Sequence, residues 1–295
     1  MEEKIERLLG LAVLTVWGTA AFGGGDVPSK ALNQGGVVNT RHNLTQSYLG
    51  ASSVFMDFAR NNYGEVCVYC HTPHGASAVV AAPLWNRTAT GTAYTLYNRP
   101  TNATVTQPGT NSLTCLSCHD GTVAVDSIIN MPGSGKYNAA QASSQNTAFL
   151  NAWSNPSGID ATDNHEGLNA TGCLSCHNPA GQAQAPDFTV FAIGTDLTND
   201  HPVGIRYPTT FGEGGDFKPP AVSSGNLAFF DSDGNGRADS KNVRLYNTGE
   251  GYEVECASCH DPHGVPSGGP GSVFNPSFLR VANTNSALCQ TCHNK

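Results

Sequence analysis

The sequence is poor in charged residues, in apolar residues and in long periodic segments. Of its 295 residues, 13% are charged and 39% are hydrophobic, and both shares lie below the roughly 25% and 45–50% of ordinary soluble domains. The 33 glycines and 17 prolines interrupt any long helix or strand. We therefore expect a mostly irregular, loop-rich chain with short helices, whose side chains alone supply little material for a core.

Excess positive charge and a second long hydrophobic run are also missing. The formal net charge of −8 argues against nucleic acid and anionic membrane surfaces as partners. The one apolar run, residues 8–17, is followed by Gly-Thr-Ala-Ala and is typical of a signal peptide over residues 1–21. Because Glu outnumbers the basic residues ahead of this run, an uncleaved anchor is the alternative. We expect an exported protein that is extracellular or at the cell surface, or otherwise periplasmic.

No cysteine lies outside one repeated pattern, C-x-x-C-H. The ten cysteines form five copies with their histidines: Cys67, Cys70 and His71; Cys115, Cys118 and His119; Cys173, Cys176 and His177; Cys256, Cys259 and His260; Cys289, Cys292 and His293. In this pattern two thiols add to the vinyl groups of a haem, and the imidazole binds one axial face of its iron. The sequence thus predicts a multihaem cytochrome c, with a loop-rich chain wrapped around a stack of five covalent haems.

Two other readings of the cysteine pairs fit less well. A zinc ribbon needs two pairs about 15–20 residues apart, whereas the pairs here lie farther apart, and five pairs cannot be divided evenly among four-cysteine sites. Thioredoxin-like redox pairs require no following histidine. Both alternatives leave the five histidines of the pattern unexplained.

Five further histidines remain, one for each predicted haem: His42, His74, His165, His201 and His263. This equality predicts that every iron has two imidazole ligands, which leaves no open position for a substrate and favours electron transfer over catalysis. His74 and His263 each lie three residues after a C-x-x-C-H histidine, on a similar face of a helical turn, where they could serve adjacent haems. Outside the signal segment the only methionines are Met56 and Met131, and Met56 fits core packing better than ligation.

The motifs repeat along the chain. CVYCHTPHG, from Cys67, matches CASCHDPHG, from Cys256, and TNSLTCLSCH, from Thr110, matches TNSALCQTCH, from Thr284. We therefore predict a first two-haem unit over residues 22–129 and a second over residues 187–295. Residues 130–186 are interpreted as an inserted single-haem module.

A separate acidic cluster has part of a calcium-loop pattern. Asp231, Asp233, Asn235 and Asp239 occupy positions 1, 3, 5 and 9 of such a loop, but Asn242 replaces the Glu expected at position 12. Possible calcium binding and a plain Asx-and-Gly turn both explain the cluster.

With these motifs, the chain resembles the doubled-CXXCH multihaem c-type cytochromes, and among them the extracellular cytochrome nanowire subunits. The markers are HNL at His42, the two CHxPHG segments, CLSCHDG, DLTNDHPVG at His201 and the terminal CQTCHNK. These segments correspond to a four-haem core, to which the middle module adds a fifth haem together with His165. The resemblance implies closely stacked haems and copies of the same chain joined head to tail, with His42 as the candidate inter-subunit ligand.

Two functions follow as hypotheses. The first is a filament subunit for extracellular electron transfer, with other redox proteins or extracellular electron acceptors as partners. The alternative is a monomeric periplasmic electron shuttle. An enzyme such as a multihaem reductase is disfavoured by the histidine count. Whether the chain forms filaments depends on its assembled surface.

Overall fold

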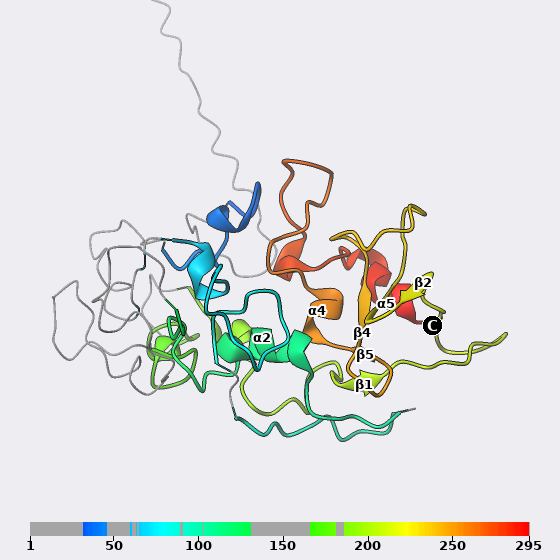
Figure 1. The fold of residues 1–295 in the computed structure, drawn as a ribbon, viewed down its shortest axis with the longest axis horizontal. Helices are drawn as coiled ribbons and strands as arrows, with labels where there is room; N and C mark the ends of the chain where they lie inside the picture. The colour runs from blue at the N-terminus through cyan, green and yellow to red at the C-terminus, as the bar shows by residue number, and fades with distance from the viewer. Residues whose placement is uncertain are drawn as a thin grey trace, which may run out of the picture.

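The computed structural model describes residues 32–45, 60, 63, 65–88, 91–101, 103–130, 166–180 and 186–294 (Figure 1). The predicted signal peptide, Met56, Met131 and His165 lie outside these ranges. The described helices are η1 (Val37–Asn39), η2 (Cys67–Tyr69), α2 (Thr110–His119), η4 (Cys173–Ser175), η5 (Thr189–Phe191), α4 (Cys256–Cys259), η6 (Pro276–Phe278), η7 (Thr284–Ser286) and α5 (Ala287–Cys292). Within the described ranges, no helix has the length and apolar character needed to span a membrane.

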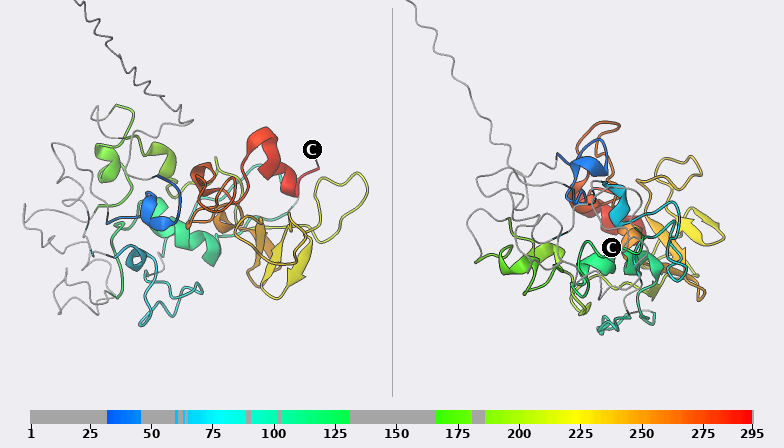
Figure 2. Two further views of the ribbon diagram at one scale, coloured as in Figure 1. Left: turned by 90° about the horizontal axis from the view of Figure 1, so that it is seen from above. Right: turned by 60° about the vertical axis from the view of Figure 1, so that its left-hand side comes forward.

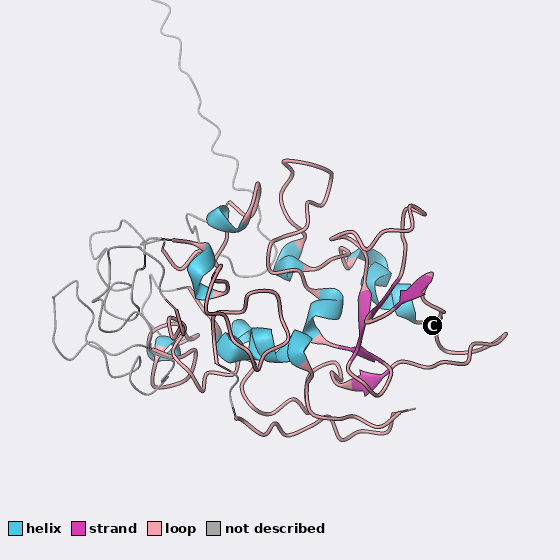
Figure 3. Ribbon diagram, viewed as in Figure 1, coloured by secondary structure: helices cyan, strands magenta, loops and turns pink. Residues whose placement is uncertain are grey.

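A five-stranded antiparallel sheet corrects the expected fold class (Figure 3). Its strands are β1 (Ile205–Arg206), β2 (Val222–Ser224), β3 (Leu227–Phe229), β4 (Arg244–Asn247) and β5 (Tyr252–Val254), in the spatial order β1-β5-β4-β3-β2. The prediction of a mostly irregular chain with short helices, wrapped around a haem stack, is therefore wrong. Figure 2 shows this sheet at one end of the molecule and η4 towards the other.

The sheet was not predicted from the sequence because its strands are only two to four residues long. Alternation of polar and apolar residues needs about four residues or more to stand out. One local signal was present, because Gly225 and Asn226 connect β2 to β3, with Ser224 opposite Leu227. Gly225 has a φ of 58°, and Gly-Asn is typical of two-residue hairpin turns that need positive φ.

Buried apolar side chains form three small clusters, and each reaches a C-x-x-C-H segment. The first contains Tyr63, Val68, Tyr69 and Ile128, with Cys70 against it; the second contains Tyr207, Ala228, Phe230, Val243 and Leu245, with Leu288 and Cys292 against it; the third contains Tyr94, Leu116 and Leu197. The second cluster joins the sheet to α5. The strands therefore contribute to positioning the last C-x-x-C-H segment.

The N-terminal described segment, residues 32–45, is held by the second predicted unit. Gln34 pairs with Val273 in an isolated bridge, and the N–H of Phe274 donates to the carbonyl of Asn33 at 2.6 Å. In Figure 1 the segment, in blue, lies beside the orange loop that follows α4. This contact fixes the approach of His42 to the rest of the chain.

Candidate haem sites

Each C-x-x-C-H segment forms one tight helical turn. The histidine N–H donates to the carbonyl of the first cysteine in four of them: His71 to Cys67 at 2.8 Å, His177 to Cys173 at 2.9 Å, His260 to Cys256 at 3.1 Å and His293 to Cys289 at 2.9 Å. The remaining segment, Cys115 to His119, is the C-terminal part of α2. A closed turn of this kind brings the thiols and the following imidazole near one another, as a covalent haem requires.

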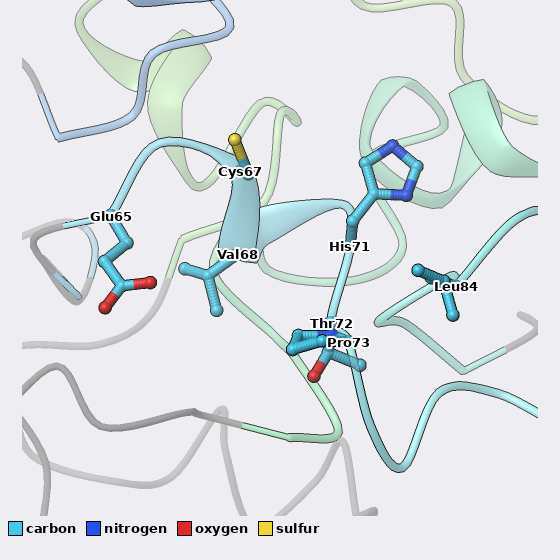
Figure 4. A pocket seen from close by; sticks show the side chains of 7 residues that line it. All are labelled: Glu65, Cys67, Val68, His71, Thr72, Pro73 and Leu84. Carbon is cyan, nitrogen blue, oxygen red and sulfur yellow. The ribbon is translucent and has the colours of Figure 1, made fainter.

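Figure 4 shows this arrangement at the first segment. The sulfur of Cys67 and the ring of His71 project to one side of η2, and Val68 projects to the other. Val68 and Leu84 also line a cavity of about 240 Å³ that reaches Cys67 and His71. The apolar wall and the two reactive groups fit an attachment site for a flat, largely apolar group.

Four of the five C-x-x-C-H histidines have Nδ1 hydrogen-bonded to a distant backbone carbonyl. The pairs are His71 with Pro83 at 2.8 Å, His119 with Phe191 at 2.6 Å, His177 with Pro186 at 2.7 Å and His260 with Ser277 at 2.7 Å. A carbonyl can only accept, so Nδ1 carries the proton and Nε2 keeps a lone pair. This outer hydrogen bond is typical of metal-binding histidines, and the donor set therefore fits a haem iron.

The segments at Cys67 and Cys256 are supported in the same way. The N–H of Asn86 donates to the carbonyl of Cys70 at 2.9 Å, and the N–H of Arg280 donates to that of Cys259 at 2.7 Å. In both cases the returning segment also supplies the carbonyl that binds the histidine. The matching contacts give the two segments a common local geometry.

Burial affects several of the cysteine thiols. All ten cysteines are free, and burial raises the pKa of Cys70 and Cys292 to about 12 and that of Cys173 and Cys259 to about 11. Reactive redox cysteines have lowered thiol pKa values instead. Across the described ranges, no group of three or more His, Cys, Asp or Glu could hold a metal ion, so the zinc interpretation gains no support.

Two of the additional histidines face a C-x-x-C-H histidine. The ring centres of His71 and His263 are 6.2 Å apart with an interplanar angle of 10°, and those of His42 and His119 are 6.2 Å apart at 84°. Burial lowers the pKa of His42 to about 4, which keeps its imidazole in the neutral form that binds metals.

The other additional histidines are not in these two pairs. His74 and His201 are exposed, and His165 lies outside the described residues. The ligand roles of these three stay predictions. His293, the histidine of the fifth C-x-x-C-H segment, packs against Phe217, with ring centres 4.8 Å apart.

The second and fourth segments meet where α2 packs against α4. The carboxylate of Glu255 accepts a hydrogen bond from the N–H of Gly109 at 3.0 Å and another from the hydroxyl of Ser112. The same hydroxyl accepts from the N–H of Cys256 at 2.8 Å. Burial raises the pKa of Glu255 to about 7. One carboxyl group thus fixes the distance between two attachment segments.

Sequence analysis missed Glu255 as a positioning residue. It had one local signal, because Glu255 and Ser258 form a capping box around the first turn of α4. Its contact with Ser112, 143 residues away, had none. The backbone carbonyls that bind the histidines could not be predicted from the sequence either, because every residue carries a carbonyl.

The acidic cluster forms a turn closed by its own hydrogen bonds. The side-chain amide of Asn235 donates to Asp233 at 3.0 Å and to Asp239 at 2.6 Å, and Asp231 accepts from backbone N–H groups of the loop. Asn242, at position 12 of the calcium pattern, is fully buried. An Asx-rich turn accounts for this arrangement without a cation, and calcium binding is not supported.

Comparison with known families matches residues 250–295 to the family described as Doubled CXXCH motif. The matched residues contain the last two C-x-x-C-H segments. This match, which covers less than half of the chain, supports a multihaem c-type cytochrome with covalently bound haem. Comparison with curated proteins found no significant match.

Proposed function

We propose that this protein is an electron carrier with five covalent c-type haems, one at each C-x-x-C-H segment. The observation that carries the proposal is the set of four histidines whose Nδ1 atoms are bound to carbonyls, each on a turn that also holds two thiols. When bound, the haem iron accepts and releases single electrons. The chain's own residues orient four of the five imidazoles and hold neighbouring attachment segments near one another.

Four of the five attachment segments form a series in space. Cys118 contributes to raising the pKa of Cys70, and Cys256 contributes to raising that of Cys115, so the two thiols of each pair lie near one another. Cys259 contributes in the same way to raising the pKa of Cys292. Electrons would therefore pass from the first segment to the second, fourth and fifth, or in the opposite direction.

The proposed coordination disfavours catalysis. The five additional histidines provide one second ligand for each iron, and an iron with two imidazole ligands has no vacant position for a substrate. Mass spectrometry of the mature protein tests the haem count, with five haems expected and four in a variant carrying both Cys173→Ala and Cys176→Ala. Near-infrared magnetic circular dichroism should show only low-spin bis-histidine iron. A count other than five, or a large high-spin fraction, contradicts the proposal.

Assembly into filaments is the first of two forms that we propose. It is supported by the resemblance to nanowire subunits, in which an N-terminal histidine binds a haem of the next subunit. One observation favours the monomeric carrier: His42 faces His119 of its own chain, and its Nδ1–H donates a hydrogen bond to the carbonyl of Pro262 at 3.1 Å. Residues 32–45 are also held by the second unit of the same chain.

Negative-stain microscopy of the wild type and a His42→Ala variant separates the two forms. If His42 is an inter-subunit ligand, the wild type forms filaments and the variant loses them while keeping five haems. If His42 serves its own chain, the variant has one altered iron and its assembly state does not change. Dispersed wild-type particles would support the monomeric shuttle and contradict the filament.

A further inference from the structure

His263 comes from the second predicted unit, yet its ring faces the histidine of the first attachment segment. The centres of the His71 and His263 rings are 6.2 Å apart and the rings are nearly parallel, at 10°. Two metal–imidazole bonds of about 2 Å each, plus about 1 Å from each nitrogen to its ring centre, give a separation of about 6 Å. The observed separation therefore suits two imidazoles on opposite sides of one iron.

The hydrogen bonds of both rings support this orientation. Nδ1 of His71 is bound to the carbonyl of Pro83 at 2.8 Å, and Nδ1 of His263 is bound to the Asp261 carboxylate at 2.9 Å. Each ring therefore keeps the Nε2 lone pair for a metal. The partners differ in charge, because Asp261 is a carboxylate and Pro83 contributes a neutral carbonyl.

Asp261 is held in place by a buried cation. Its second carboxylate oxygen accepts a hydrogen bond from Arg280 at 3.1 Å, and the Arg280 side chain is only 4% exposed. Arg280 also donates to the carbonyls of Ala257 and Ser240. The carboxylate cannot easily turn away from His263 without breaking this network.

The first repeat lacks the same feature. The CHxPHG segment at Cys67 has Thr72 at the position of Asp261, and the Thr72 hydroxyl donates to the carbonyl of His74. The other facing pair also lacks a carboxylate, because Nδ1 of His42 is bound to the carbonyl of Pro262 and Nδ1 of His119 to that of Phe191. Of these two facing pairs, only His71 and His263 include a charged acceptor.

We propose that His263 is the second axial ligand of the haem attached at Cys67 and Cys70, and that Asp261 lowers the reduction potential of this haem. The inference rests on the proposed haem binding. A carboxylate on the outer nitrogen makes an imidazole a stronger electron donor, and a stronger donor stabilises ferric iron relative to ferrous iron. Asp261 acts through His263 and is a positioning residue.

The potential is tested with Asp261→Asn in the haem-loaded protein, because asparagine keeps an acceptor oxygen but removes the charge. Spectroscopic redox titration should show one of the five components moved to higher potential and the other four unchanged. Asp196→Asn is the matched control, since it removes a carboxylate that binds the N–H of Thr198 and contacts no histidine. If the Asp261→Asn titration overlays that of the control, the tuning role is refuted.

The ligand assignment is tested with His263→Ala. We expect five attached haems, one of which becomes high-spin, and recovery of the low-spin spectrum on addition of free imidazole. Five low-spin irons in this variant would overturn the assignment. An electron-density map of the haem-loaded wild type supplies an independent test if the variant does not fold, because Nε2 of His263 must lie on the iron held by His71. Absence of covalent haem would instead refute the proposed function itself.

Discussion

Arg87 provides the sharpest test of how the second attachment segment is held. The residue is 2% exposed. Its guanidinium makes four hydrogen bonds: Nε to the Ser117 hydroxyl at 3.1 Å, and terminal nitrogens to the carbonyls of Ser117 at 2.6 Å, Ala124 at 3.0 Å and Val125 at 2.9 Å. Ser117 lies between Cys115 and His119. One side chain therefore connects the chain that returns past the first segment to the turn of the second.

Replacing Arg87 with Met keeps much of the side-chain volume and removes all four bonds. Three carbonyls lose a charged donor in a place that water reaches poorly, and each buried group left without a partner costs about 1–3 kcal/mol. Because the loop at Ala124 and Val125 can relax, we expect the lower end of this range for each. The free energy of unfolding should fall by about 3–4 kcal/mol.

Urea unfolding of the haem-loaded protein, followed by circular dichroism, measures this change. Arg206→Met is the matched control, because the Arg206 ion pair with Glu250 has side chains 48% and 69% exposed. An exposed pair contributes about 1 kcal/mol or less, so the control should stay near the wild type. If the two variants unfold at the same urea concentration, Arg87 does not stabilise the segment as reasoned.

Two further predictions concern Glu255 and Gly264. Burial raises the folded-state pKa of Glu255 to about 7 from 4.5, so the stability that this group contributes is fully present below pH 4.5 and is lost as the pH rises through 7. In Glu255→Gln, the free energy of unfolding should fall less over this pH range, measured by urea unfolding at several pH values. An unchanged pH dependence would contradict the prediction. Gly264 has a φ of +87°, and an added Cβ would lie 2.2 Å from the Phe274 ring. Gly264→Ala should therefore lower the melting temperature far more than the control Gly225→Ala, where φ is also positive but no atom lies within 4 Å of the added Cβ. Equal losses in melting temperature would refute the steric argument.

The local sequence determined how the thiols and imidazole of each C-x-x-C-H segment are placed. The thiols and the imidazole of a C-x-x-C-H segment lie within five consecutive residues, so one helical turn brings them together whatever surrounds it. The Asx-rich turn at Asp231 is also formed by residues close together in the sequence, so a turn could be predicted there as one of two interpretations, the other being a calcium site. The two CHxPHG segments were likewise visible as a repeat before any fold was known.

Tertiary structure decided which distant groups meet. His71 faces His263, which is 192 positions away in the sequence, and His42 faces His119, which is 77 positions away. No local sequence pattern encodes contacts over such separations. The same is true of Glu255 against Ser112 and of the five-stranded sheet, whose short strands gain their stability by pairing with one another. Residue types thus determined what each segment can bind, whereas chain packing determined the partner that each histidine faces.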